Sequence, residues 1–126
     1  MPATASGWRR FSPCLPPAYR HAFEFRHPSW HNEAVYALLQ AHNVAFCIFE
    51  LAGFRTPLVC TADFAYVRLH GPGGAYQGCY DEATLGWWAR TLQKWQEAGR
   101  DGYVFFDNDE AGYAVRNALT LQQLLR

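Results

Sequence analysis

Four short runs rich in apolar residues recur along the chain. They cover residues 21–26 (HAFEFR), 44–51 (VAFCIFEL), 64–70 (FAYVRLH) and 102–107 (GYVFFD). Their length, their apolar alternation or continuity, and their content of β-branched and aromatic residues are typical of β-strands. The pattern therefore predicts four strands.

Helical patterns lie between or after three of these runs. Residues 32–42 carry apolar side chains three and four positions apart, with Ser29 or Asn32 available as the N-cap. Residues 82–98 follow the capping residue Asp81 and place leucine and tryptophan on one face. Both segments are predicted to be amphipathic helices.

A third helix is expected after Asp109, whereas the segment behind the second run contains Gly53 and Pro57 and no helical pattern. Strands and helices in alternation predict an α/β protein with parallel strands and right-handed crossovers. A doubly wound fold usually has a glycine-rich phosphate loop after its first strand, and here residues 26–30 (RHPSW) follow instead. We therefore expect parallel (β/α) units of a TIM-type barrel, with about four strands, as in a half or truncated barrel.

Composition narrows the classes of partner. The chain has 126 residues, half of them hydrophobic, and its 11 basic and 11 acidic residues give a formal net charge of zero. Such a chain lacks the field that favours nucleic acid, so no nucleic-acid partner is expected. The four cysteines are widely spaced and are expected to be reduced thiols. Without a signal peptide or an apolar run long enough for a bilayer, we expect a cytoplasmic location and no membrane partner.

Polar residues lie at the carboxyl ends of the predicted strands, whereas the residues at the strand starts are apolar or small. In a (β/α) barrel the carboxyl ends of the strands form the active site. The residues at these ends are Glu24, Arg26, His27, Glu50, Arg68, His70, Asp107, Asn108 and Asp109. A charged residue within an apolar strand must pair or face a solvated cavity. The alternative to a functional site is a set of barrel-lining salt bridges without chemistry.

A metal site is a further interpretation of these residues. Residues 107–112 (DNDEAG) imitate the start of an EF-hand loop, but Ala111 and Ala118 stand where oxygen ligands are needed, which excludes an EF-hand. A divalent ion bound by side chains from separate strands stays open, with the ligands Glu24, His70, Asp107 and Asp109. For Asp109 we favour the role of a helix N-cap.

The loop at residues 70–78 (HGPGGAYQG) is long and rich in glycine. It could bind an anion through backbone amides, although glycine and proline also mark any mobile barrel loop. It matches neither the P-loop nor the dinucleotide fingerprint, so no nucleotide cofactor is indicated.

At these positions the sequence resembles the YecE-like family (domain of unknown function 72). The matching stretches are residues 23–30 (FEFRHPSW), 61–72 (TADFAYVRLHGP), 76–80 (YQGCY), Trp88-Ala89 with Trp95, and 103–119 (YVFFDNDEAGYAVRNAL). The resemblance implies a TIM-type barrel with no established reaction, and a chain roughly twice as long as this one. Residues 21–126 would then be the C-terminal half of the barrel domain, behind an irregular lead-in at residues 1–20.

The expected function is that of a barrel enzyme, or part of one, acting on a small polar or phosphorylated substrate. Glu24 or His70 is predicted to act as the acid or base, and Asp107 to orient the histidine or bind a metal. The predicted substrate-binding residues are Arg26, His27, Trp30, Arg68, Tyr76 and Asn108. Asp109 is the predicted metal ligand.

Other functions stay open. The chain could be a non-catalytic ligand-binding or scaffold domain, or a non-functional truncated fragment. Because four parallel strands leave two open edges, a homodimer or a complementary half-barrel is the expected partner, beside a small-molecule ligand.

Overall fold

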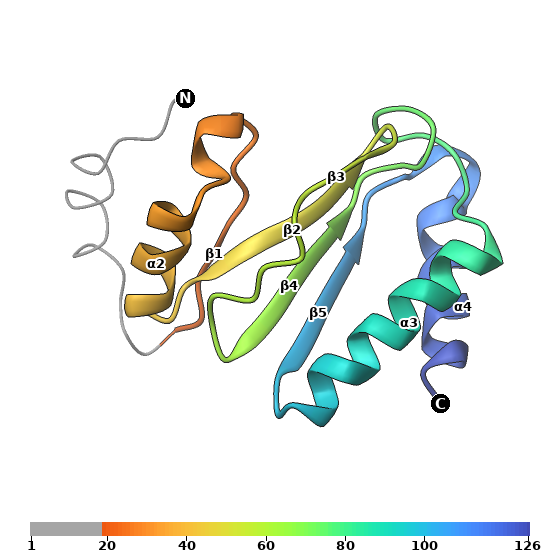
Figure 1. Ribbon diagram of the computed structural model, residues 1–126. Coiled ribbons are helices and arrows are strands. Elements are labelled where there is room, and N and C mark those ends of the chain that lie inside the picture. Colours follow the sequence, from red (N-terminus) through yellow and green to blue (C-terminus); the bar gives the residue numbers. More distant parts are fainter. Residues whose placement is uncertain (1–18) are drawn as a thin grey trace.

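The computed structural model describes residues 19–126, which form one sheet with helices packed against it (Figure 1). The strands are β1 (Ala22–Phe23), β2 (Ala45–Leu51), β3 (Phe54–Arg55), β4 (Phe64–Leu69) and β5 (Asp101–Phe106). The helices are α2 (Glu33–Ala41), α3 (Glu82–Glu97) and α4 (Tyr113–Leu124), with the 3₁₀ turns η2 (Pro28–Trp30) and η3 (Glu110–Gly112). In this described part of the chain, no helix is long and apolar enough to cross a membrane. The expected irregular lead-in lies, up to residue 18, outside the described residues.

The sheet has the strand order β1-β2-β4-β5, and neighbouring strands in this order run parallel. This confirms the predicted α/β fold with parallel strands. The antiparallel strand β3 turns back along β2 and takes the place of a crossover helix between β2 and β4, as Gly53 and Pro57 predicted. The outer face of the sheet therefore lacks one helix at this position.

The two faces of the sheet differ in chemistry because strand side chains alternate. On the outer face, apolar residues of β2, β4 and β5 pack against all three helices. This core includes Phe46, Ile48, Val67, Leu69, Leu39, Leu85, Trp88 and Leu121, with Val104 and Phe106 packed against it. The inner face has a smaller apolar cluster made by Ala22, Ala45, Ala62, Phe64 and Tyr66. Toward the carboxyl ends of the strands the inner face becomes polar.

Two helices begin where the sequence predicts. The Asn32 side chain accepts a hydrogen bond from the Val35 amide at 3.0 Å, which caps α2. The Asp81 side chain accepts one from the Thr84 amide at 2.7 Å, which caps α3. Each cap satisfies a backbone donor that the first helical turn leaves unpaired.

The third helix and the first strand differ from expectation. Asp109 makes no side-chain capping bond, and α4 begins only at Tyr113. The left-handed residues Ala111 (φ 53°) and Gly112 (φ 75°) insert an extra turn between them, so the predicted N-cap role of Asp109 is wrong. Strand β1 pairs with β2 over two residues and not over the whole of 21–26.

Candidate functional site

Five charged or ionisable side chains meet on the inner face at the carboxyl ends of the strands. They are Glu24 and Arg26, which follow β1, Arg68 within β4, His70 directly after it, and Asp107 directly after β5. We call these five residues the rim cluster. The structure brings them together as the polar strand ends predicted, because parallel strands deliver their carboxyl ends to the same edge.

His70 lies at the centre of the rim cluster and is 0% exposed. Its Nδ1 lies 2.8 Å from Oδ2 of Asp107, and its Nε2 lies 3.0 Å from Oε1 of Glu24. A charged imidazole can donate to both carboxylates, whereas a neutral one donates from a single nitrogen. His70 thus links the two carboxylates through its ring.

Two arginines neutralise the carboxylates. Nη2 of Arg68 donates to Oδ2 of Asp107 at 2.9 Å, and its Nη1 donates to Oε1 of Glu24 at 3.4 Å. Arg26 donates to Oε2 of Glu24, and its Nη2 lies 3.3 Å from Nε2 of His70. The side chains of Arg26 and Arg68 are 45% and 37% exposed, against 13% for Glu24. Both guanidinium groups therefore keep surface toward solvent while they hold the acids.

These contacts determine the charge states of Glu24 and Arg26. Burial would raise the pKa of Glu24, but hydrogen bonds from Arg26 and His70 outweigh burial, and the pKa lies below its ordinary value. Burial would likewise lower the pKa of Arg26, but hydrogen bonds to Tyr76 and Glu24 outweigh it and the pKa is raised. Glu24 and Arg26 are therefore both charged at neutral pH.

Cys47 of β2 lies beneath Glu24, with its Sγ 3.6 Å from Oε1. Burial and then the neighbouring carboxylate charge raise the pKa of this thiol. Because the thiolate is the reactive form, this shift disfavours a nucleophilic role for Cys47, whose thiol donates to Glu24. Among the described cysteines, Cys47, Cys60 and Cys79 are free thiols, and Cys14 lies outside the described residues.

The glycine-rich loop lies over His70. The Tyr76 amide donates to the His70 carbonyl at 2.6 Å, and the two rings meet edge-on with centroids 5.5 Å apart. Nη2 of Arg26 donates to the Tyr76 hydroxyl at 3.5 Å. Gly71 has a φ of 138°, and a Cβ there would lie 2.4 Å from the Gly74 carbonyl oxygen, so only glycine fits. Tyr76 is half exposed and covers the centre of the rim cluster.

Two buried residues that the sequence reasoning missed, Asn117 and Tyr80, anchor this loop. Oδ1 of Asn117 accepts from the Tyr80 amide at 3.1 Å and from Nδ2 of Asn108 at 2.9 Å. Asn108 also donates to the Gly78 carbonyl at 2.8 Å, and the Tyr80 hydroxyl accepts from the Gly71 amide at 2.9 Å. The available signal was an asparagine between Ala114 and Leu121, which are apolar positions of the helix.

Other residues from the predicted site lie outside the rim cluster. Nδ1 of His27 accepts from the Ser29 amide at 3.2 Å and caps η2. Trp30 is 7% exposed and stacks on Phe25 with centroids 4.5 Å apart. Asn108 binds the glycine-rich loop through the Gly78 carbonyl. These contacts are those of turn and core residues.

Glu50 and Asp109 also depart from the expected arrangement. Glu50 faces the outer side of the sheet, where Trp88 Nε1 donates to it at 2.7 Å and Arg55 pairs with it at 2.9 Å. Its even position in β2 explains this, since the inward residues of β2 are the odd ones. Within residues 19–126, no group of three or more His, Cys, Asp or Glu side chains could hold a metal ion. The expected cation site with Asp109 is therefore not assembled, because arginines and His70 already pair with Glu24 and Asp107.

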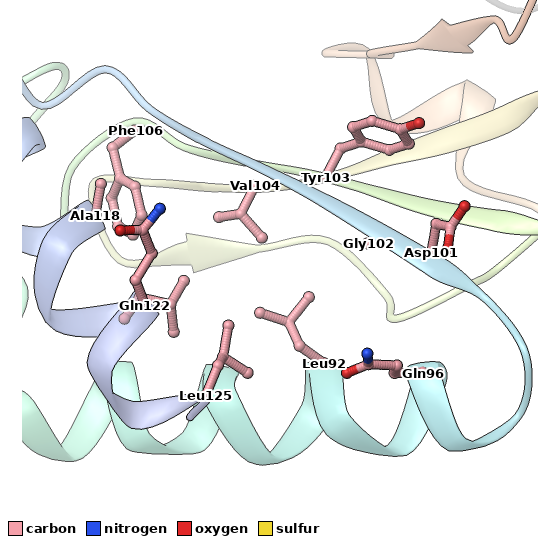
Figure 2. A pocket seen from close by; sticks show the side chains of 11 residues that line it. Leu92, Gln96, Asp101, Gly102, Tyr103, Val104, Phe106, Ala118, Gln122 and Leu125 are labelled. Atoms are coloured by element: carbon pink, nitrogen blue, oxygen red, sulfur yellow. The ribbon is translucent and has the colours of Figure 1, made fainter.

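A cavity of about 530 Å³ lies on the other face of β5, between this strand, α3 and α4 (Figure 2). Its apolar lining includes Leu92, Val104, Phe106, Leu121 and Leu125. Val104 and Phe106 point outward, opposite to Asp107. The cavity is therefore separate from the rim cluster.

Residues 3–126 match the family model described as "Protein of unknown function DUF72". The chain belongs to the DUF72 family. A DUF72 family protein from Thermotoga maritima has a solved structure that is 26% identical, with a TM-score of 0.85 over 98% of this chain and 53% of that chain. This confirms the resemblance that the strand-end motifs suggested.

Two solved structures of a DUF72 family protein from Enterococcus faecalis show the same fold. They have TM-scores of 0.80 and 0.79 at 18% and 20% identity, and cover 98% and 99% of this chain. The chain spans about half the length of the DUF72 structures it matches, namely 53%, 54% and 57% of those chains. No curated protein matches it. The family thus defines the fold and supplies no specific activity.

Proposed function

We propose that the rim cluster is an acid–base site for a small anionic substrate. The observation that supports it is His70, which is fully buried and has a carboxylate at each ring nitrogen. Such an environment is typical of groups that exchange protons, and the carboxyl ends of parallel strands are where barrel enzymes place their chemistry.

The carboxylates take different roles in this proposal. Asp107 accepts a hydrogen bond from Nδ1–H of His70 and orients the ring, so that Nε2 faces Glu24. Nε2 donates a hydrogen bond to Glu24 when it carries a proton, and takes the proton from Glu24 when it does not. Glu24 has the exposed surface that His70 lacks, and its lowered pKa keeps it ionised, so Glu24 is the base that meets the substrate. His70 then takes up or returns the proton behind it.

The arginines define the class of substrate. Arg26 and Arg68 are partly exposed and both point at the Glu24 carboxylate, so an anionic group placed beside them would meet two guanidinium forks. Phosphate and carboxylate match this geometry best. Tyr76 on the glycine-rich loop covers the bound molecule.

Thermal melting of the full chain with inorganic phosphate, phosphate monoesters and dicarboxylates tests the binding part. At least one of these anions should raise the melting temperature. Arg68→Gln should weaken its binding about tenfold, the equivalent of roughly 1.4 kcal/mol. Glu24→Gln should bind at least as tightly as the wild type, because the variant removes a negative charge.

Arg55→Gln is the matched control, since the Arg55 side chain is 39% exposed and pairs with Glu50 on the outer face. This variant should bind the anion like the wild type. The proposal fails if no anion stabilises the chain, or if Arg55→Gln and Arg68→Gln weaken binding equally. The rim cluster would then be a set of structural salt bridges.

A further inference from the structure

On the inner face of the sheet, a side chain that precedes the first strand reaches the strand at the opposite edge. Arg20, which precedes β1, donates to Asp101 at 3.0 Å and to the Tyr103 hydroxyl at 2.8 Å, and both of these residues belong to β5. Strands β2 and β4 lie between β1 and β5. Three strand spacings amount to about 14 Å along a flat sheet. Side chains stand roughly perpendicular to a flat sheet, so the contact of Arg20 with the short Asp101 side chain across this span indicates a sheet that curves toward its inner face, as a barrel wall does.

This curved wall has two open edges. In the described part of the chain, β1 is hydrogen-bonded to β2 alone and β5 to β4 alone. The inward residues Tyr103 and Phe105 are 39% and 47% exposed. Together with Phe64 and Tyr66 they line a hollow of about 260 Å³ on the inner face. A barrel interior is normally packed with side chains, so this face lacks its covering layer.

We propose that a second copy of this chain closes the barrel. In this assembly β5 of each copy pairs in parallel with β1 of the other, around a two-fold axis that coincides with the barrel axis. The rotation brings each open edge against an edge of the other kind and leaves no edge unpaired. It also keeps all strands pointing in one direction, so both rim clusters open at the same end.

Three features favour a second copy as the occupant. The chain covers 53% of the Thermotoga maritima protein with a TM-score of 0.85, so two copies supply about the number of residues of one such chain. With four parallel strands in each copy, the pair has the eight strands of a TIM-type barrel. The formal net charge is zero, so the copies approach without mutual repulsion.

Helix α4 supplies further apolar surface at the same seam. Val115 and Leu119 are 66% and 56% exposed and lie four residues apart on one side of the helix. A right-handed crossover helix lies over the seam between its own strand and the next one, which here would be β1 of the second copy. Closure would therefore cover both residues.

Closure would also complete the site. Each rim cluster occupies half of the circumference of the barrel at the carboxyl ends of the strands. The second copy would supply the other half of this barrel mouth. A substrate would then lie between two clusters, with Arg26 and Arg68 of each copy around it. The mouth in a single copy is open on one side.

Light scattering after size exclusion on the full 126-residue chain measures the assembly. The expected mass is twice the chain mass of 14.4 kDa. Phe105→Lys places a charge inside the closed barrel and should give a single-chain mass with an unchanged circular dichroism spectrum. Val115→Lys on α4 is a second variant. Because the Val115 side chain is 66% exposed in a single copy, the substitution should leave the isolated fold intact and weaken the dimer.

Leu58→Lys is the matched control, because Leu58 is 41% exposed and belongs to the connection between β3 and β4. This variant should stay dimeric. A wild-type chain with a single-chain mass at every concentration, or a Phe105→Lys variant that stays dimeric, would overturn the proposal. Co-expression of two differently tagged copies gives an independent readout. Recovery of a different chain of similar size in place of the second tag would contradict a second copy as the occupant.

Discussion

Nδ1 of His70 lies 2.8 Å from Oδ2 of Asp107, and the same oxygen accepts a hydrogen bond from Arg68 at 2.9 Å. The Asp107 carboxylate thus holds a fully buried imidazole and a partly exposed guanidinium in place, and Nδ1 of His70 lies 2.7 Å from its Oδ1 as well. Asp107 therefore fixes the positions of His70 and Arg68 relative to each other.

Asp107→Asn should destabilise the fold by about 2 kcal/mol, because the amide no longer balances Arg68 and leaves His70 with one carboxylate. Urea unfolding followed by circular dichroism measures the change. Asp101→Asn is the control, since the side chain of Asp101 is 72% exposed and pairs with Arg20 at the surface. Equal effects of the two substitutions would mean that the buried contact adds nothing.

Glu24→Gln should remove part of the acid sensitivity of the fold. The folded-state pKa of Glu24 lies below its ordinary value of 4.5, so its ionised form stabilises the fold above that value. This stabilisation is lost as the pH falls through the lowered pKa. The difference in melting temperature between wild type and variant should therefore stay constant above pH 4.5 and shrink as the pH falls below this value. Glu97→Gln, at an exposed position of α3, should show no such trend.

Asn117→Ala should destabilise the chain by about 2 to 3 kcal/mol, because it leaves the buried Tyr80 amide without its acceptor and takes a partner from Asn108. Limited proteolysis should in addition cut residues 71–78 faster. Thr120→Ala in the same helix is the control, since its hydroxyl bonds only to the Arg116 carbonyl one turn earlier. A loop that stays resistant in Asn117→Ala would show that α4 does not anchor it.

Gly71→Ala should cost about 1 to 3 kcal/mol, because the added Cβ meets backbone atoms and the φ of 138° is unfavourable for alanine. Gly73→Ala provides the comparison within the same loop, since no atom of residues 19–126 lies within 4 Å of a Cβ at Gly73. Thermal melting separates the two variants. If both behave like the wild type, the loop is not held in the described conformation.

The sequence predicted the strands and the composition of the rim cluster because both depend on local patterns. The period of two along each strand puts Arg68 and His70 on one side, and parallel strands bring their ends together. Two helix caps, Asn32 and Asp81, were also readable because a cap acts on residues two or three positions away.

Other features depend on contacts that no local pattern encodes. Asp109 has the composition of a cap, but the left-handed turn at Ala111 and Gly112 moves the helix start beyond its reach. Asn117 bonds to residues 37 and 9 positions away, and its role follows only from the packing of α4 beneath the loop. Glu50 was misplaced because β2 is buried on both faces, so its nearly continuous apolar run does not show which of its alternating residues point outward.

The shortness of β1 has a consequence for the dynamics of the rim cluster. Glu24 and Arg26 follow a strand of two residues that lies, in a single copy, at an edge of the sheet, whereas His70 and Asp107 follow strands of six. Edge segments with few backbone hydrogen bonds open by local unfolding at a lower free energy than the centre of a sheet. Backbone amides near Ala22 should therefore exchange with deuterium faster than those of β4. Each opening would separate Glu24 from His70 while the rest of the fold persists, so the cluster would be the first part of the native state to come apart.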